Sequence, residues 1–297
     1  MTAPAIEVRA VTRHFGRISA VEDITFQVPE NSVCGLLGRN GAGKTTLMSL
    51  ISGQDRPTSG EVRVLGEDPF ENRRVLAALS FVRDNQRYPD DYRLRHVLAV
   101  APRFHPAWDD ELAARLVDAF RLPAKPQVKK FSRGQLSSLG IVLGLASRAA
   151  ITIFDEPYLG LDATARTTFY DLLLQDYAEH PRTILVSTHL IDEMEPLLQE
   201  VVIVDRGRLL RADTVEELSG AAFTVSGLAA PTTEFAAGRR VLREHRVGGL
   251  LSLTVEGPLS PAERERARAA GLDLQHARLQ ELVAAYGADP EPEGVRA

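Results

Sequence analysis

One segment carries the residue types and the spacing that bind a phosphate chain. Residues 38–45 read Gly-Arg-Asn-Gly-Ala-Gly-Lys-Thr, after an apolar strand and before a helical run. Glycines let backbone N–H groups turn toward one anion, and the next helix directs its positive end there. Lys44 adds charge for the phosphates, and Thr45 offers a hydroxyl to Mg²⁺. A chance match in a chain of this length is about 1 in 100. The predicted nucleotide-binding residues are Gly38, Arg39, Asn40, Gly41, Ala42, Gly43, Lys44, Thr45 and Thr46.

Two carboxylates follow a second apolar strand. Ile151–Phe154 predicts a buried strand, and Asp155 and Glu156 come directly after it. An open α/β sheet binds its ligands at the carboxyl ends of its strands. Asp155 is predicted to hold the metal, and Glu156 to act as the general base for an attacking water. The alternative is a solvated turn, which is the usual role of such a pair; the upstream phosphate loop favours the functional interpretation.

A third candidate is the start of a charge-free helix. Ser132 and Gln135 have capping-box spacing, which any helix can use. The same hydroxyl, the free N–H groups of Arg133 and Gly134 and the arginine's charge also suit an anion. Taken alone, the segment is better explained as a helix cap. Its position, with Ser132 23 residues before Asp155, favours the anion-binding interpretation.

The elements that must position these residues follow a mixed α/β pattern. Apolar strands are predicted at 33–37, 80–83, 151–154, 183–187 and 201–204, with helical segments between several of them. Apolar strands separated by helices predict a parallel sheet covered on both faces. The first 32 residues alternate instead and predict antiparallel hairpins, and residues 84–130 predict a mostly helical insertion.

The sequence pattern changes after Arg211. Strands are predicted at 223–226, 250–256 and 272–276, and helices at 232–237, 261–270 and 279–286. This pattern indicates a compact βαβαβ-like appendage, followed by a frayed tail at 287–297. We therefore predict a nucleotide-binding domain at 1–211, with a helical subdomain at about 84–147, and a small C-terminal α+β domain at 212–297.

Composition excludes several classes of protein. The 297 residues include 44% hydrophobic and 25% charged residues, which excludes disorder. One cysteine, Cys34, excludes an internal disulfide and favours a reducing compartment. No stretch approaches the ~20 apolar residues of a membrane span, and the N-terminus lacks a secretory core. The net charge of −5, from 35 basic and 40 acidic residues, argues against broad nucleic-acid binding.

Together these motifs resemble the nucleotide-binding subunit of ATP-binding cassette (ABC) transporters, over roughly residues 5–211. Segment 38–45 is similar to Walker A, 131–135 to the signature motif and 151–156 to Walker B. Asp162 is similar to the D-loop aspartate, His189 to the switch histidine and Phe15 to the aromatic that stacks on adenine. The resemblance implies an α/β P-loop NTPase (RecA-like) core with an antiparallel β subdomain and a helical subdomain.

Two positions depart from the family pattern. Phe131 and Arg133 replace the usual first and third residues of the signature Leu-Ser-Gly-Gly-Gln. Asp84 falls where the family usually has a glutamine that meets Mg²⁺ or water, with Gln86 as the alternative. Other residues keep structural alternatives too. His189 suits a satisfied loop histidine, Phe15 a core position, and Asp162 a helix cap.

The resemblance further implies ATP and Mg²⁺ as cofactors, Glu156 and His189 as catalytic residues, and Thr45, Asp155 and Asp84 as metal ligands. ATP would lie between the P-loop of one subunit and the signature of another, in a homodimer or heterodimer. The chain would power transport, more readily export, through a separate transmembrane permease, from the cytoplasmic face of the membrane. The alternatives are a soluble cassette ATPase acting on ribosomes or nucleic acid, and a regulatory nucleotide sensor.

Overall fold

The computed structural model describes residues 4–84 and 86–287, and contacts between Cα atoms divide them into two compact units. Unit 1 comprises residues up to His189 together with Leu197–Ala212, and unit 2 comprises Leu190–Pro196 and the residues from Asp213 onward. The division after Ala212 lies one residue from the predicted boundary, and the short segment Leu190–Pro196 groups with the C-terminal residues. The predicted frayed tail, from residue 288 onward, lies outside the described residues.

Unit 1 is built on a six-stranded sheet in the order β5-β6-β7-β3-β8-β9. The pairings of β3 with β7 and β8, and of β6 with β5 and β7, are parallel, as the apolar strand runs predicted. The strands are β3 (Val33–Leu37), β5 (Leu79–Val82), β6 (Ile151–Asp155), β7 (Thr183–Thr188), β8 (Glu200–Asp205) and β9 (Arg208–Thr214). Every residue of β3, β6 and β7 is buried, because helices and a second sheet cover both faces.

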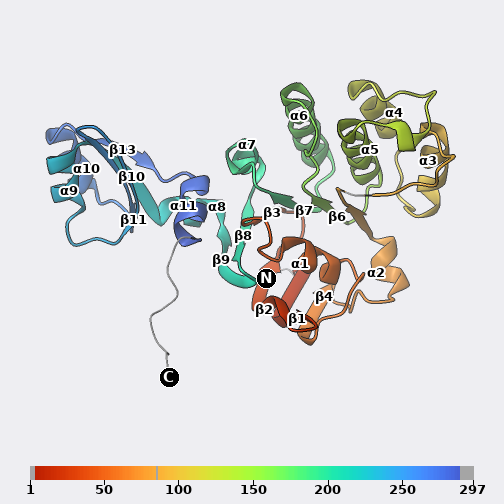
Figure 1. Cartoon of the computed structure of the whole chain (residues 1–297), viewed down its shortest axis with the longest axis horizontal. Coiled ribbons are helices and arrows are strands. Elements are labelled where there is room, and N and C mark those ends of the chain that lie inside the picture. The colour runs from red at the N-terminus through yellow and green to blue at the C-terminus, as the bar shows by residue number, and fades with distance from the viewer. Residues whose placement is uncertain (1–3, 85, 288–297) are drawn as a thin grey trace. The chain divides into compact units, whose positions relative to one another are not determined.

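A three-stranded antiparallel sheet, in the order β2-β1-β4, packs beside this core (Figure 1). It consists of β1 (Ile6–Phe15), β2 (Ile18–Val28) and β4 (Ser59–Val64), which confirms the predicted N-terminal hairpins. Helix α1 (Lys44–Ile51) lies between the two sheets and contacts β2, β4 and β6. Its buried side chains Leu47, Met48, Leu50 and Ile51 join both sheets into one hydrophobic core. This packing fixes the helix that begins at Lys44.

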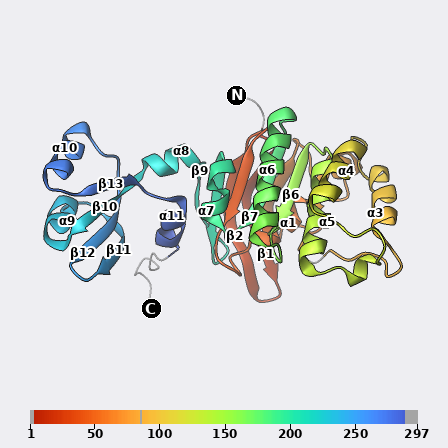
Figure 2. The same cartoon turned by 90° about the horizontal axis from the view of Figure 1, so that it is seen from above.

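The helical part of unit 1 lies along β5 and β6, where α5 (Arg133–Ala146) packs on both strands and contacts α4 (Asp110–Ala119) and α6 (Ala163–Glu179) (Figure 2). Its buried residues run almost continuously from Ser138 to Ala146. Besides α1, the helices of this unit are α2 (Arg73–Ala77), α3 (Leu94–Val100), η1 (Ala101–Arg103), α4 (Asp110–Ala119), η2 (Val128–Lys130), α5 (Arg133–Ala146) and α6 (Ala163–Glu179).

Unit 2 has its own core and corrects the predicted C-terminal topology. An additional strand, β11 (Val241–Val247), makes the connectivity βαββαβ, and the four strands form an antiparallel sheet in the order β11-β12-β10-β13. This is the connectivity of ferredoxin-like folds. The other elements are α7 (Ile191–Met194), η3 (Glu195–Leu197), whose last residue is assigned to unit 1, α8 (Val215–Gly220), β10 (Ala222–Leu228), α9 (Ala229–Ala236), β12 (Leu250–Glu256), α10 (Pro261–Ala269), β13 (Asp273–His276) and α11 (Leu279–Tyr286).

Among the described residues, no helix combines the length and the apolar character that crossing a bilayer requires.

Candidate functional site

A cavity of about 1120 Å³ opens at the carboxyl ends of the parallel strands. The loop after β3 and the residues that end β6 line it, together with Ser19 and Ala20 of β2 and polar residues that follow β5 and β8. Because β6, β7 and β3 are neighbours in the sheet, their ends converge at one edge, where a doubly wound sheet binds its ligand. The cavity brings together Asn40, Gly41, Gly43, Lys44, Thr45, Thr46, Asp84, Asp155 and Glu156 from the predicted site.

The phosphate loop depends on glycine at two points of close approach. Gly38 has φ +151° and Gly43 has φ +104°, both conformations that side chains with a Cβ rarely adopt. A Cβ at Gly38 would lie 2.2 Å from the carbonyl oxygen of Val204, and one at Gly43 would lie 2.8 Å from that of Ala20. The loop is therefore held tightly between β8 and β2. Arg39 and Ala42 belong to the same loop without lining the cavity.

Lys44 is buried, with 6% of its side chain exposed. Its Nζ donates to the carbonyl oxygens of Gly38 and Arg39 at 2.8 and 3.2 Å, and lies 3.7 Å from Glu156 Oε1. The ammonium group is thus directed over the loop and toward the acid pair. A buried cation at this position is suited to the phosphate oxygens of a nucleotide.

Asp155 lies at the centre of a polar contact set. Thr45 donates its hydroxyl to Asp155 Oδ2 at 3.0 Å, and Ser187 donates to Oδ1 at 2.7 Å. Ser187 is the residue of β7 directly opposite Asp155 in the parallel register, and its Oγ also accepts the backbone N–H of Glu156 at 2.9 Å. One strand pairing therefore orients both members of the acid pair.

Glu156 and His189 meet at this edge of the sheet. His189 Nδ1 lies 3.1 Å from Glu156 Oε2 and 3.1 Å from the hydroxyl of Tyr158, which accepts the backbone N–H of His189 at 2.8 Å. The two rings pack edge to face at 5.3 Å. Glu156 has φ +47°, a strained conformation for a glutamate and one often found at functional sites. The structure thus joins the predicted base and the predicted histidine into one group.

The residues of the signature-like segment start α5. The Ser132 side chain accepts the backbone N–H of Gln135, and the Gln135 side chain accepts that of Ser132, so the predicted capping box is formed. A Cβ at Gly134 would meet the carbonyl oxygen of Gly160 at 2.5 Å, so the turn at 160 packs directly on this helix start. Residues 132–135 do not line the cavity of their own chain. Asp162 caps α6 by accepting the N–H of Ala165 at 2.8 Å.

Asp84 and Phe15 occupy different kinds of position. Asp84 lines the cavity and forms an ion pair of 2.9 Å with Arg133; Gln86 lines the cavity as well. Phe15 ends β1 and is 49% exposed, with the Arg13 guanidinium 4.6 Å from its ring centroid. It lies outside the cavity lining, whereas Ile18, its partner in the β1–β2 register, forms part of that lining.

Three residues that line the cavity or contact its acid pair and histidine were not predicted from the sequence. Tyr158 follows the acid pair in Asp155-Glu156-Pro157-Tyr158, and this position was the available signal. Ser187 could have been found by aligning β7 with β6 in parallel register. Arg206, at the turn between β8 and β9, lines the cavity itself, and nothing in the local sequence distinguishes it from a surface arginine.

The donor set fits Mg²⁺ in the way that phosphate-binding enzymes hold it. Magnesium in such sites takes one or two carboxylates, waters and substrate phosphates rather than a complete protein cage. Thr45 Oγ1 and Asp155 Oδ2 lie 3.0 Å apart, and Asp84 Oδ1 is a buried carboxylate oxygen without a hydrogen-bond partner. Across residues 4–84 and 86–287, no group of three or more His, Cys, Asp or Glu side chains could hold a metal by itself.

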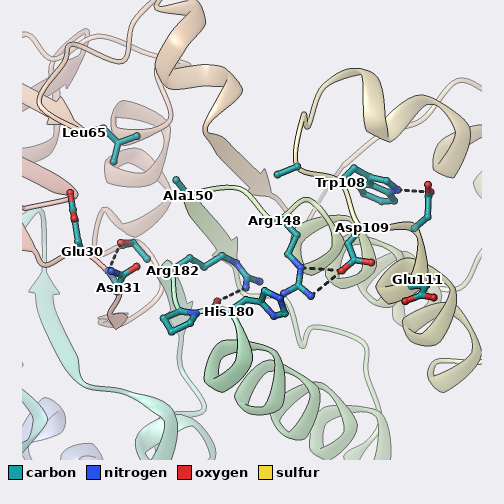
Figure 3. A pocket seen from close by; sticks show the side chains of 14 residues that line it. Glu30, Asn31, Leu65, Trp108, Asp109, Glu111, Arg148, Ala150, His180 and Arg182 are labelled. Carbon is teal, nitrogen blue, oxygen red and sulfur yellow. Dashed lines mark hydrogen bonds and ion pairs between the residues drawn. The ribbon is translucent and has the colours of Figure 1, made fainter.

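A second cavity, of about 940 Å³, lies at the opposite edge of the sheet, where β6 and β7 begin (Figure 3). Arg148 donates from Nε and Nη2 to Asp109 Oδ2 at 3.2 and 3.0 Å. The N–H of Leu112 and the Arg148 guanidinium hold the pKa of Asp109 below its usual range. This cavity includes none of the predicted site residues.

Comparisons with known proteins agree with the geometry. The family model described as ABC transporter matches residues 21–159, and one described as AAA domain, putative AbiEii toxin, Type IV TA system matches residues 126–194. The Nod factor export ATP-binding protein I of Paraburkholderia xenovorans (strain LB400) is 30% identical over 214 residues, which cover 70% of each chain. The chain belongs to the ABC transporter ATP-binding proteins. The ABC transporter ATP-binding protein YtrB of Bacillus subtilis (strain 168) is 25% identical, over 72% of this chain and 73% of that protein.

The same fold is found in solved ABC cassettes. The dimeric post-hydrolysis structure of the ATP-binding cassette MJ0796 bound to ADP and Pi superposes with a TM-score of 0.62 at 21% identity, over 71% of this chain and 98% of that one. The predicted P-loop NTPase fold is thereby confirmed. The family confirms the prediction of an ATP-binding, ATP-hydrolysing transporter subunit.

Proposed function

We propose that this chain powers export by hydrolysing ATP in the cavity at the carboxyl edge of its six-stranded sheet. The observation that carries the proposal is the convergence there of Lys44, the Thr45–Asp155 pair and the Glu156–His189 pair. Lys44 and the N–H groups of the loop would bind the phosphates. Most of the catalysis in phosphoryl transfer is positioning and electrostatic stabilisation of this kind.

Glu156 and His189 divide the work on the attacking water in this proposal. Glu156 accepts a proton from the water as general base, and His189, held by the Tyr158 hydroxyl, contacts the γ-phosphate. Thr45, Asp155 and Asp84 would hold Mg²⁺, which neutralises charge on the phosphates when it is bound. The contacts of His189 with both Glu156 and Tyr158 support this division.

We further propose that two ATP-binding subunits, identical or different, close on ATP. Ser132, Gly134, Gln135 and Asp162 would then face the nucleotide of the partner subunit, because in their own chain they lie outside the cavity lining. The dimer reported for the cassette MJ0796 supports this arrangement. Binding ATP between two subunits makes their closure depend on the γ-phosphate, and hydrolysis lets them separate.

The membrane partner would dock on a groove in the helical part of unit 1. An apolar groove of about 510 Å³ lies between β5 and α3, and Phe104 on its wall is 68% exposed. The other lining residues include Phe81, Tyr88, Tyr92, Val97 and His105. Burial lowers the pKa of His105, so this wall stays uncharged at neutral pH. An uncharged groove suits an apolar helix of a permease, and the chain would be held at the cytoplasmic face of the membrane.

The direction of transport rests on the relatives, one of which is named for the export of Nod factor. The partner is tested by capturing the tagged chain from detergent-solubilised membranes of its own cells. Recovery of a protein with several membrane spans supports the proposal, and Phe104→Asp should reduce that recovery. Recovery of ribosomes with either chain would instead favour a soluble ATPase acting on the ribosome.

Replacing the proposed base tests the reaction itself. Glu156→Gln keeps the size of the side chain but removes the proton acceptor, so kcat should fall by about 10²–10⁴-fold while ATP still binds. The measurements are steady-state ATPase activity and equilibrium binding of a fluorescent ATP analogue. Glu179→Gln, an exposed position at the end of α6, is the matched control. Full hydrolysis by the Glu156 variant would remove Glu156 from the role of base.

A further inference from the structure

Two side chains that depart from the usual family sequence contact each other beside the nucleotide cavity. Asp84 follows β5 and Arg133 begins α5, 49 residues away, and Arg133 Nη2 lies 2.9 Å from Asp84 Oδ2. Asp84 lines the cavity that contains Lys44 and Thr45, and Arg133 is not part of that lining. The ion pair therefore connects the wall of the cavity to the first turn of a helix outside it.

The Asp84 carboxylate depends on this one cation. Its side chain is 19% exposed, and its second oxygen, Oδ1, is buried without a hydrogen-bond partner. The neighbouring Arg83 is engaged elsewhere, since it donates to Gln54 at 2.9 Å. Among the described residues, Arg133 is the one basic side chain in an ion pair with Asp84. Leaving a carboxylate largely removed from water without a cation costs free energy. Asp84 would therefore bind another cation that comes within reach.

The stem of Arg133 is fixed by the backbone on which it packs. A Cβ at Gly160 would lie 2.9 Å from Arg133 Cγ and 3.0 Å from its Cβ, so the arginine fills the space above this glycine. Gly134 touches the same glycine from the next position of the helix. Packing against the turn at 160 limits the rotamers of the arginine, which lowers the entropy lost in forming the ion pair.

We propose that Arg133 is an internal counter-ion that competes with the cation of the bound nucleotide for Asp84. It is then a positioning residue for the cavity of its own chain. The inference rests on the proposed function, since it requires a magnesium nucleotide in this cavity. A carboxylate shared between two cations interacts with each less strongly. The ion pair with Arg133 therefore weakens the attraction between Asp84 and a cation in the cavity. By linkage, a bound cation weakens the hold of Asp84 on the start of α5.

The test is a double-mutant cycle on the full chain with Arg133→Gln, Asp84→Asn and the double variant. The unfolding temperature is measured at a fixed concentration of a non-hydrolysable ATP analogue while Mg²⁺ is increased. The readout is the Mg²⁺ concentration at which half of the maximal rise in unfolding temperature is reached. Arg133→Gln should lower this concentration by about two- to fivefold, the factor expected from an ion pair whose arginine is 60% exposed. Asp84→Asn should raise it, and Arg133→Gln should have no further effect in the Asp84→Asn background. Arg133→Lys, which keeps the charge, should stay close to the wild type.

The cycle separates this role from a direct contact between Arg133 and nucleotide. A direct contact would make the effects of the two substitutions add, and additive effects would overturn the proposal. An unchanged or raised half-saturating concentration in Arg133→Gln would overturn it as well. If Arg133→Gln does not fold, Arg133→Met supplies the same uncharged test. A wild-type chain that the analogue fails to stabilise at any Mg²⁺ concentration would contradict the proposed function, a result distinct from failure of the cycle alone.

Discussion

At the scale of single residues, the site is a set of short polar contacts fixed by strand register. Asp155 accepts hydrogen bonds from the hydroxyls of Thr45 and Ser187, and Glu156 lies against His189. The acid pair itself needs no unusual sequence, because a strand end followed by two carboxylates is common. What makes these acids a site is that β7 places Ser187 beside one and His189 beside the other.

The Tyr158 hydroxyl gives a prediction about the histidine. This hydroxyl accepts the backbone N–H of His189 at 2.8 Å and lies 3.1 Å from His189 Nδ1. Tyr158 itself is 2% exposed. Tyr158→Phe keeps the ring packing but frees the imidazole to turn away from Glu156. We expect kcat for ATP hydrolysis to fall about tenfold with little change in KM, since roughly 1.4 kcal/mol of positioning is lost.

The control for this prediction is Tyr92→Phe, which removes a tyrosine hydroxyl from the helical part of the same unit. Its ring packs against His96 and does not line the nucleotide cavity. Steady-state kinetics over a range of ATP concentrations separate kcat from KM. A Tyr158 variant with wild-type kcat would show that His189 does not require this hydroxyl.

At the scale of elements, local motifs were predictable and contacts between distant segments were not. The phosphate loop and the capping box at Ser132 depend on residues within eight positions of one another, so their sequences reveal them. The Asp84–Arg133 ion pair joins residues 49 positions apart, and no local pattern indicates which of the arginines that follow would reach Asp84. The register that places Ser187 beside Asp155 has the same long-range origin.

The missed strand β11 has a specific physical cause. Its sequence, Val-Leu-Arg-Glu-His-Arg-Val, is mostly polar, and none of its residues is buried because it lies at the edge of its sheet. Burial of alternate residues on one face is the signal by which strands are predicted, and this strand gives little of it. Charged side chains on an edge also discourage pairing with other chains, which explains the composition.

Helix α6 carries a buried charge that supports a prediction on stability. Phe169, Leu173 and Asp176 form its buried stripe, and Asp176 forms ion pairs with Arg148 and with Arg182, the latter at 2.7 Å. The Arg182 side chain is 6% exposed, so removing its partner leaves a buried cation uncompensated. Asp176→Ala should lower the free energy of unfolding by about 3–5 kcal/mol.

Chemical denaturation measured by circular dichroism checks this value. Asp171→Ala, on the exposed face of the same helix, is the matched control and should change the stability by less than about 0.5 kcal/mol. Equal effects of the two substitutions would show that the arginines at the amino edge of the sheet find other partners when Asp176 is removed.

At the scale of the whole molecule, the chain combines two units with separate cores. The nucleotide cavity, the phosphate loop and the acid pair lie in unit 1, whose core joins the parallel and antiparallel sheets. Unit 2 packs its antiparallel sheet against α9 and α10 around Phe223, Val225, Leu253 and Val255. The segment Leu190–Pro196, directly after His189 in the sequence, is assigned to unit 2, and the chain returns to unit 1 at Leu197. The sequence predicted one boundary near residue 211 and gave no sign of this excursion, because α7 has only four residues.

Separate cores predict separate unfolding transitions. Leu253 is 4% exposed in the core of unit 2, so Leu253→Ala should destabilise that unit by about 2–5 kcal/mol and lower one of two transitions in differential scanning calorimetry. An ATP analogue with Mg²⁺ should raise only the other transition, because it binds unit 1; at a hundred times its dissociation constant the added stability is about 2.7 kcal/mol. Leu228→Ala, at a side chain 65% exposed, is the control and should leave both transitions in place. A single transition that both the substitution and the nucleotide displace would mean that the two cores unfold together, and that the C-terminal unit contributes directly to the stability of the ATPase.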